Sequence, residues 1–307
     1  LEQSMSIQAS AVNKFMGVFG SMLVNSGEPP ELREKIHGAS KRMPPPPKEA
    51  VYEEVRIAGG VPAYWVSMPN VDRKKVLLFI HGGGYMFGGT MFTHKDMVWR
   101  LSKAANCQVL SVDYRLAPEH PYPAAQDDCF AAYRWLIERF NPKSIAIAGD
   151  SAGGGLTFAT LLRIKDEGLP IPAAVVGMSP WTDLACTGES VVTNASKDVL
   201  IPGEGIKEGI PYILGNADPL HPYASPLYGD FTGCCPALIQ VGSEEVLLDD
   251  SRRLAQKMEA SGVPVVLDIW SKMPHVWQVM SMILPEGKIA IDRIGVFLRG
   301  HMRSVSL

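Results

Sequence analysis

Residues 144–154 read Ser-Ile-Ala-Ile-Ala-Gly-Asp-Ser-Ala-Gly-Gly, a short apolar run followed by a serine that stands between two glycines. The apolar run predicts a buried strand, and the residues from 153 to 165 have the composition of a helix. A sharp strand-to-helix turn strains the backbone of its central residue and brings the neighbouring residues together, which requires glycine on both sides. The stretch therefore predicts a nucleophile elbow that exposes the Ser151 Oγ at the start of a helix. A glycine-rich turn carrying a surface serine is the alternative.

Strand-like and helix-like segments alternate on both sides of this turn. Short extended or apolar runs predict strands at residues 51–57, 63–67, 76–80, 108–112, 144–148, 173–178, 237–241 and 265–270. Longer segments predict helices at residues 124–140, 153–165, 249–261 and 285–301. Strands that are apolar on both faces and are separated by helices form a mostly parallel sheet covered by helices on each side. We therefore predict an α/β fold.

Two segments interrupt this alternation. Residues 188–228 are polar and rich in proline and glycine, with at most two short helices at 202–206 and 209–214, so we interpret them as an insertion. The first forty residues carry methionine and phenylalanine at helical spacing, and the prolines at 44–47 stop any helix. A chain of 307 residues is near the upper limit for one hydrophobic core, so we expect one large domain with an accessory layer.

The composition excludes several classes of function. A formal net charge of −3 with both signs well mixed offers no electrostatic footprint for nucleic acid or for an anionic membrane. No apolar run approaches the ~20 residues that span a bilayer. The first thirteen residues lack the basic leader and the apolar stretch of a secretion signal. We therefore expect a cytoplasmic protein with no nucleic-acid partner and no stable membrane insertion.

The five cysteines are an odd and scattered set without the spacing of a metal site, so we expect reduced thiols. Cys234 and Cys235 are adjacent in the sequence. A vicinal disulfide or a pair of metal ligands is the alternative for these two residues.

A second motif, His81-Gly82-Gly83-Gly84, directly follows the predicted strand 76–80. Consecutive glycines let the backbone approach a substrate closely with its N–H groups turned inward, as an oxyanion hole requires. We assign the N–H groups of Gly83, Gly84 and Ala152 as the donors, and we expect His81 to hold the loop in place. A phosphate-binding loop is the alternative, but such a loop leads into a helix, whereas this one runs into a Tyr-Met-Phe sequence.

A serine nucleophile needs a base and an acid that orients the base. Of the seven histidines, only His275 follows the last predicted strand in a loop, and the chain order serine, acid, histidine is that of α/β-hydrolases. Four carboxylates compete for the role of the acid in the loop after the preceding strand. Asp249 and Asp250 suit the N-cap and first turn of the next helix. Glu244 and Glu245 lie at the carboxyl end of the strand, where open α/β sheets place ligand-facing residues.

Together these motifs resemble the hormone-sensitive-lipase family of esterases, the bacterial family IV group, over essentially the whole chain. The oxyanion motif at 81–84 and the nucleophile motif at 149–154 match, and so does the segment 113–119, Asp-Tyr-Arg-Leu-Ala-Pro-Glu. In this family the acid is usually an aspartate followed by Pro-Leu. Here Glu245 stands in its place. A glutamate is one methylene longer, so it reaches His275 only if its side chain folds back or the loop is set further away.

The resemblance implies a carboxylesterase that hydrolyses small-molecule esters with short acyl chains. Ser151 would be the nucleophile, His275 the base and Glu245 the acid, and neither a metal nor a cofactor is needed. A non-catalytic receptor on the same scaffold is one alternative. Hydrolysis of amides or lactones by the same residues is another.

The resemblance also implies an α/β-hydrolase fold with a helical cap. Residues 1–45 and 188–228 would form the cap, and residues 46–187 and 229–307 would form the catalytic domain. Aromatic side chains near the oxyanion loop and in the cap are candidates for contact with the substrate, namely Tyr85, Phe87, Phe19 and Trp181. The sequence is also compatible with a homodimer.

Overall fold

An eight-stranded sheet forms the centre of the computed structural model, which describes residues 17, 28–201, 203 and 205–305. The strand order is β1-β2-β4-β3-β5-β6-β7-β8. The strands are β1 Val51–Arg56, β2 Pro62–Ser67, β3 Asp72–Ile80, β4 Cys107–Val112, β5 Ile145–Asp150, β6 Ala174–Met178, β7 Ala237–Gly242 and β8 Val265–Trp270. Strands β3 to β8 run parallel, whereas β2 pairs antiparallel with both β1 and β4.

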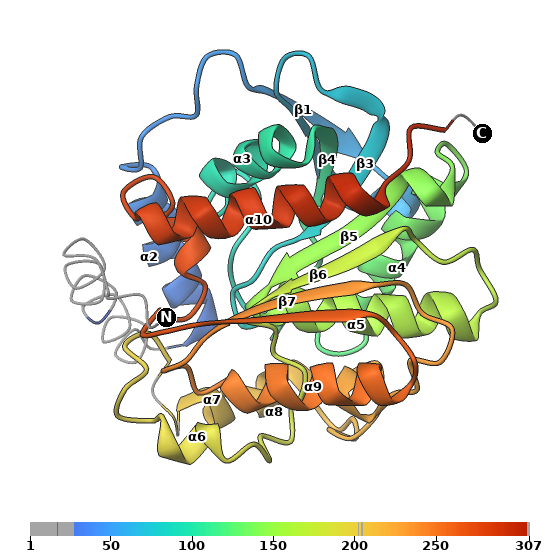
Figure 1. Cartoon of the computed structure of the whole chain (residues 1–307). Coiled ribbons are helices and arrows are strands. Elements are labelled where there is room, and N and C mark those ends of the chain that lie inside the picture. Colours follow the sequence, from blue (N-terminus) through green and yellow to red (C-terminus); the bar gives the residue numbers. More distant parts are fainter. Residues whose placement is uncertain (1–16, 18–27, 202, 204, 306–307) are drawn as a thin grey trace.

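Helices cover both faces of this sheet (Figure 1). Helices α3 (Lys95–Ala105) and α10 (Pro285–His301) lie side by side on one face. The opposite face is covered by α4 (Ala124–Ile137), α5 (Ser151–Asp166) and α9 (Leu248–Ala260). The other described helices are α2 Pro29–Ser40, α6 Ser190–Thr193, α7 Gly205–Glu208 and α8 Ile210–Leu214, with short 3₁₀ turns η1 Ala58–Gly60, η2 Pro142–Ser144, η3 Pro226–Tyr228 and η4 Trp277–Met280.

The central strand β3 is buried on both faces, which explains its continuous apolar sequence at residues 76–80. Leu77 and Phe79 belong to the core that lies under α3 and α10. Leu78 and Ile80 belong to the larger core on the opposite face. Alternate side chains of one strand therefore hold the two helical layers together.

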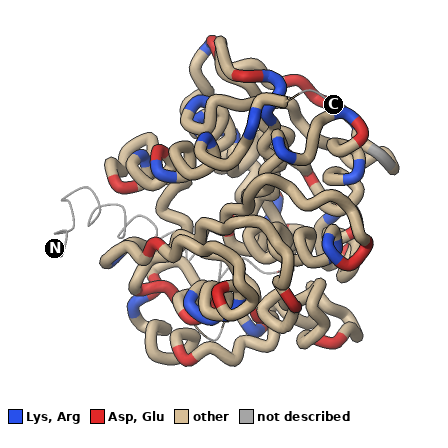
Figure 2. The backbone as a smooth tube through the Cα atoms, turned by 45° about the vertical axis from the view of Figure 1, so that its right-hand side comes forward, with Lys and Arg blue, Asp and Glu red and all other residues tan. Residues whose placement is uncertain are grey.

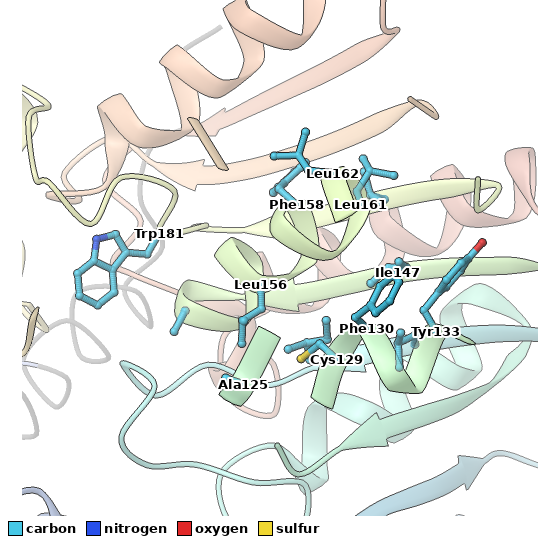
Figure 3. Close-up of a cluster of buried hydrophobic side chains, with 14 of the residues drawn as sticks. Ala125, Cys129, Phe130, Tyr133, Ile147, Leu156, Phe158, Leu161, Leu162 and Trp181 are labelled. Atoms are coloured by element: carbon cyan, nitrogen blue, oxygen red, sulfur yellow. The ribbon is translucent and has the colours of Figure 1, made fainter. Parts of the chain in front are cut away.

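Aromatic and branched side chains of α4, α5 and β5 fill the larger core. Figure 3 shows Phe130 and Tyr133 on α4, Leu156 and Phe158 on α5, and Ile147 on β5 between them. Nearly every residue of α5 is buried, so this helix is apolar around most of its circumference. The start of α5 is thus held in place by the core of the domain.

The direction of the strand order reverses at β3. From β3 the chain passes through α3 to β4, which lies on one side of β3 within the sheet. It then returns through α4 to β5, which lies on the other side of β3. In open α/β sheets, ligands bind outside the carboxyl ends of the strands at such a reversal. His81 and Ser151 are the residues that directly follow β3 and β5. The fold therefore brings both predicted motifs to the same edge of the sheet.

The predicted α/β fold is confirmed, and every predicted strand is present close to its expected position. Helix α3 is absent from the predicted helices, although Met97, Val98 and Leu101 recur at helical spacing and face the core. The helix expected at 202–206 begins only at Gly205. The helix expected from the methionines and phenylalanines near the N-terminus lies outside the described residues, apart from Gly17.

Some expectations concern the surface and the thiols. All five cysteines are free thiols, Cys234 and Cys235 included, as expected. Among the described residues no helix combines the length and the hydropathy that a membrane span requires. Lysine and arginine are interspersed with aspartate and glutamate over the surface (Figure 2). The cytoplasmic location, the lack of a nucleic-acid partner and the homodimer stay predictions.

Helix α10 offers a test of its packing against α3. A Cβ added at Gly295 would lie 2.4 Å from the carbonyl oxygen of Ala104, whereas one added at Gly300 meets nothing within 4 Å. We expect Gly295→Ala to lower the free energy of unfolding by about 1–3 kcal/mol through overpacking. Gly300→Ala should raise it by up to about 0.5 kcal/mol through helix propensity. Urea denaturation measures both effects, and equal effects at the two positions would contradict the tight contact.

Candidate active site

Ser151 follows β5 directly and begins α5 in a strained conformation. Its φ is +51°, in the left-handed region that residues other than glycine rarely adopt. The glycines on either side have no room for a side chain. A Cβ at Gly149 would lie 2.2 Å from the carbonyl oxygen of Gly153, and a Cβ at Gly153 would lie 2.0 Å from that of Ile80. The sharp turn predicted from the sequence is therefore present.

His275 lies between Ser151 and Glu245. Its Nε2 is 2.9 Å from the Ser151 Oγ, and its Nδ1 is 2.8 Å from the Glu245 Oε2. An ionised carboxylate can only accept hydrogen bonds, so Nδ1 carries the proton and Nε2 has a free lone pair for the serine hydroxyl. Loops after three different strands, β5, β7 and β8, thus meet in one chain of hydrogen bonds.

Glu245 reaches the histidine by folding back over its own loop. Its Oε1 accepts the N–H of Gly242, three residues earlier, and the hydroxyl of Ser179 at 2.7 Å. Its other oxygen is thereby directed to His275. Of the two predicted ways for a glutamate to reach His275, a folded-back side chain is the one that the structure has. Of the four competing carboxylates, Glu245 is the one bonded to the histidine.

Burial affects the charges of Glu245 and His275, because both side chains are almost fully removed from solvent. Burial raises the pKa of the Glu245 carboxyl above its ordinary value, and the hydrogen bond from His275 offsets part of this effect. Burial alone would lower the pKa of His275. The hydrogen bond and the charge of Glu245 outweigh that effect, so the pKa of His275 is raised. The carboxylate therefore favours a proton on the imidazole.

The loop after β6 contacts the surroundings of all three residues. Ser179 has a left-handed φ of +46°, and its hydroxyl donates to Glu245 while its Oγ accepts the N–H of Val276, next to the histidine, at 3.1 Å. The N–H of Trp181 donates to the Ser151 carbonyl at 2.9 Å. A single serine in a loop carries no sequence pattern, so sequence reasoning has no signal for Ser179.

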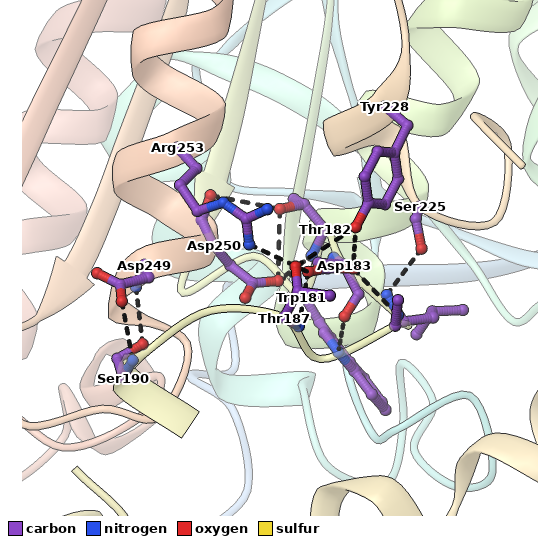
Figure 4. A network of polar contacts seen from close by, with 12 residues as sticks. Trp181, Thr182, Asp183, Thr187, Ser190, Ser225, Tyr228, Asp249, Asp250 and Arg253 are labelled. Carbon is purple, nitrogen blue, oxygen red and sulfur yellow. Dashed lines mark hydrogen bonds and ion pairs between the residues drawn. The ribbon is translucent and has the colours of Figure 1, made fainter. Parts of the chain in front are cut away.

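Asp250 holds the far end of this loop (Figure 4). Its Oδ2 accepts the backbone N–H groups of Thr182 at 2.7 Å and of Asp183 at 2.9 Å. Its Oδ1 is buried and has no hydrogen-bond partner among the described residues. Burial, with a further contribution from the nearby Asp183, raises the pKa of Asp250 to about 7.

The role expected for Asp249 and Asp250 is confirmed for the first turn of the helix and wrong for its N-cap. Both lie in the first turn of α9, but the N-cap is Leu247, which makes no side-chain cap hydrogen bond. Asp249 accepts the N–H of Ser190 in the neighbouring insertion at 2.8 Å, whereas Asp250 binds the loop after β6. A helix-capping aspartate and a loop-binding aspartate look the same in sequence.

The glycine loop after β3 has a backbone that only glycine adopts easily. Gly83 and Gly84 have φ values of +120° and +57°, and a Cβ at Gly83 would lie 2.0 Å from the carbonyl oxygen of Phe87. Within the described ranges, the N–H groups of Gly83, Gly84 and Ala152 donate to no protein acceptor. Ala152 lies in the first turn of α5, where the helix itself leaves N–H groups unpaired.

Asp150 joins the glycine loop to the serine turn. Its Oδ1 accepts the N–H of Gly82 at 3.0 Å, and its Oδ2 accepts from His94 Nε2 at 3.1 Å. His81 has the structural position expected for it, since its ring stacks on Tyr114 with 4.3 Å between centroids and its Nδ1 donates to the Gly82 carbonyl at 2.7 Å. Sequence reasoning misses Asp150 because the elbow motif leaves that position open.

Two of the four residues predicted to contact substrate pack against each other. Tyr85 and Trp181 are buried, and their ring centroids are 6.0 Å apart. Phe87 is partly buried, and Phe19 lies outside the described residues. Contact of these side chains with a substrate stays a prediction. Within the described residues, no group of three or more His, Cys, Asp or Glu side chains could hold a metal ion.

A sheet of this topology that presents a strained serine to a histidine is the architecture of the α/β-hydrolases, a class of serine hydrolases. A family model described as alpha/beta hydrolase fold matches residues 77–279 of the chain. An acetyl-hydrolase of Streptomyces hygroscopicus is 44% identical over 247 residues, which cover 80% of this chain and 82% of that protein.

Solved structures agree with this assignment. The crystal structure of an esterase from the bacterial hormone-sensitive lipase family has a TM-score of 0.92 and 41% identity, and covers 98% of this chain and 100% of that one. A crystal structure of the esterase EstE5 soaked with p-nitrophenyl butyrate has a TM-score of 0.90 and 41% identity, covering 97% and 99% of the two chains. The chain belongs to the hormone-sensitive-lipase group of the α/β-hydrolase family and is a carboxylesterase.

The unpaired oxygen of Asp250 leads to a prediction about stability. In the folded state the Asp250 carboxyl stays protonated up to about pH 7. In the unfolded state an aspartate loses its proton near its ordinary pKa. Asp250 therefore destabilises the fold increasingly as the pH rises between these two values. Asp250→Asn keeps one acceptor oxygen and cannot ionise. We expect the stability of the variant relative to wild type to increase by on the order of 2 kcal/mol from pH 5 to pH 8.

Urea denaturation at the two pH values measures this change, and Asp249→Asn is the matched control. Asp249 is on the same helical turn, and its carboxylate also accepts a backbone N–H. A pH-independent difference between Asp250→Asn and wild type would contradict the assignment.

Proposed function

We propose that the protein hydrolyses short-chain acyl esters through Ser151, His275 and Glu245 and a covalent acyl-enzyme. The observation that carries this proposal is the continuous chain of hydrogen bonds from the Glu245 carboxylate through the His275 ring to the Oγ of a strained serine. A receptor that only binds a ligand has no need of this chain, so the geometry favours hydrolysis over ligand reception.

The reaction begins when neutral His275 takes the Ser151 hydroxyl proton on Nε2 as Oγ attacks the ester carbonyl carbon. The imidazolium then gives that proton to the leaving alkoxide as the carbon–oxygen bond of the ester breaks, which leaves the acyl group on Oγ. Water next loses a proton to Nε2 and attacks the acyl carbon, and the proton returns to Ser151 as the acid leaves. Glu245 keeps the ring in the Nδ1–H tautomer and stabilises each imidazolium.

We assign the negative oxygen of the tetrahedral intermediate to the N–H groups of Gly83, Gly84 and Ala152. Three observations support this assignment: these donors have no acceptor among the described residues, they follow β3 and β5 at one edge of the sheet, and Ala152 lies in the first turn of α5. Unpaired donors held by the backbone need no reorganisation when charge develops, which makes them effective in the transition state.

A helical cap over this site, formed by residues 1–45 and 188–228, is part of the proposal, with the remainder of the chain as catalytic domain. Helices α6, α7 and α8 interrupt the alternation between β6 and β7, which supports the second cap segment. A preference for short acyl chains is supported by the name acetyl-hydrolase of one relative and by the p-nitrophenyl butyrate soaked into EstE5. Phe87 of the glycine loop is the partly exposed candidate for contact with the acyl chain.

Ser151→Ala should abolish turnover while leaving the fold intact, because no other group can carry the acyl intermediate. We expect kcat for p-nitrophenyl butyrate to fall by at least about 10³-fold. The same assay with p-nitrophenyl acetate and laurate should show that wild type prefers the short chains. An organophosphonate probe should add one label to wild type and none to the variant, read by intact mass. Normal turnover by Ser151→Ala would refute the proposed mechanism.

Glu245→Gln should lower kcat by about 10³–10⁴-fold. Both carboxylate oxygens accept hydrogen bonds, so an amide must turn its NH₂ group toward a donor, either at His275 or at Gly242. The acid limb of kcat/KM should also move to lower pH, because the charge that raises the pKa of His275 is gone. Glu244→Gln is the control and should keep nearly full activity. An inactive Glu244→Gln with an active Glu245→Gln would show that the acid is misassigned.

A further inference from the structure

The side chain of Arg33 on helix α2 contacts the segment that follows the glycine motif. The two terminal nitrogens of its guanidinium donate to the two carboxylate oxygens of Glu119, both at 2.9 Å. One of these nitrogens also donates to the carbonyl of Ala117, and Nε donates to the carbonyl of Met86, each at 3.0 Å. A single guanidinium thus binds two other segments of the chain, at Met86 and at residues 117–119, and all three of its nitrogens are used.

The two carbonyls that Arg33 binds belong to the support of the glycine loop. The N–H of Met86 donates to the Gly83 carbonyl at 3.0 Å, so holding Met86 also holds the turn that begins at Gly83. The N–H of Ala117 donates to the Tyr85 carbonyl at 2.9 Å. Arg33 therefore restrains the far end of the loop, directly at Met86, two residues beyond Gly84, and through Ala117 at Tyr85.

The insertion reaches the same point of the loop. A Cβ added at Gly209, which precedes α8, would lie 3.1 Å from the Met86 Cε, and a Cβ added at Gly84 would lie 3.8 Å from the same atom. The side chain of Met86 is therefore near the insertion, the second segment of the proposed cap, while its backbone carbonyl binds Arg33 of α2, in the first segment. Two segments that are far apart in the sequence meet at one residue of the oxyanion loop.

We propose that Arg33 is a positioning residue for the oxyanion hole, so that docking of α2 places the Gly83 and Gly84 N–H groups for catalysis. This inference rests on the proposed oxyanion role of those groups. The Glu119 side chain is 45% exposed, and an ion pair of this kind contributes little to stability. The hydrogen bonds to the two carbonyls are what reach the loop. Lysine cannot replace them, because its ammonium is a point charge without the planar fork of donors.

The conformation of the glycine loop explains why the loop needs a restraint. Gly83 and Gly84 both have positive φ values, and glycine has a wide choice of alternative conformations. A loop of consecutive glycines loses its geometry easily unless its ends are fixed. Because Asp150 binds Gly82 at the near end, Arg33 supplies the corresponding restraint at the far end.

The test compares Arg33→Lys and Arg33→Met with wild type, using p-nitrophenyl butyrate and an alkyl trifluoromethyl ketone. The ketone accepts the Ser151 Oγ at its carbonyl carbon, the serine proton moves to His275, and the resulting oxyanion occupies the same hole as the transition state. We expect kcat to fall about tenfold in both variants, KM to change less than twofold, and the affinity for the ketone to fall by the same factor as kcat. Complete labelling with the organophosphonate counts the active sites. Because kcat is calculated per labelled site, a difference in the yield of folded protein does not change it.

Arg163→Lys is the matched control. The Arg163 side chain is 24% exposed against 21% for Arg33, and it also pairs with a carboxylate, that of Asp127, but near the far end of α5. Arg163→Lys should leave kcat and the affinity for the ketone unchanged. Glu119→Gln, which keeps an acceptor for Arg33 and leaves both carbonyls in place, should lower kcat less than threefold.

The inference is overturned if both Arg33 variants keep the kcat and the ketone affinity of wild type. It is also overturned if kcat falls while the ketone affinity does not, since that result would mean a structural effect away from the oxyanion. Its failure differs from failure of the proposed function. A wild type that leaves esters intact, or a Ser151→Ala that hydrolyses them, removes the proposed function, whereas active wild type with unchanged Arg33 variants removes this inference alone.

Discussion

Everything at this site depends on how closely the backbones at the carboxyl ends of β3 and β5 approach each other. Hypothetical Cβ atoms at Gly149 and Gly153 would lie 2.7 Å and 2.0 Å from one and the same oxygen, the carbonyl of Ile80. This contact forces the chain to turn at Ser151 without an intervening loop, and the glycine loop begins one residue after the same contact. Ser151 and the proposed oxyanion donors are thus placed relative to each other by the main chain. Side chains such as Asp150 adjust a geometry that backbone packing has already imposed.

A similar contact joins the loops of Glu245 and His275, the proposed acid and base. A Cβ at Gly242 would lie 2.0 Å from the carbonyl oxygen of Met273, so the loops after β7 and β8 touch through their backbones. Glu245 turns back onto this contact and takes hydrogen bonds from Gly242, Ser179 and His275. A buried carboxylate can stay ionised only when its oxygens are satisfied in this way. The longer side chain is therefore part of the packing of the two loops.

Much of this arrangement is predictable from local sequence, and the remainder is not, for physical reasons. The sheet, the elbow and the glycine loop follow from apolar runs and from glycine spacing, which leave a pattern within a few residues. Chain order indicates His275 and narrows the acid to one loop. Arg33 and Glu119 are 86 residues apart, and a long-range pair of this kind leaves no pattern. For Asp250 the sequence suggests a role at a helix end. Its burial and its unpaired oxygen are properties of the tertiary structure and leave no local pattern.

The histidine depends on the outermost strand of the sheet. Strand β8 pairs with β7 on one side alone, and Val266 and Ile269 are 51% and 40% exposed. Edge elements open at a lower free energy than central strands, because fewer hydrogen bonds and contacts must break. Ser151, by contrast, follows a strand with neighbours on both sides. The His275 imidazole is therefore positioned from the margin of the sheet and Ser151 from its centre. We expect local opening at that margin to displace the imidazole at a lower free energy than opening of the centre would displace the serine.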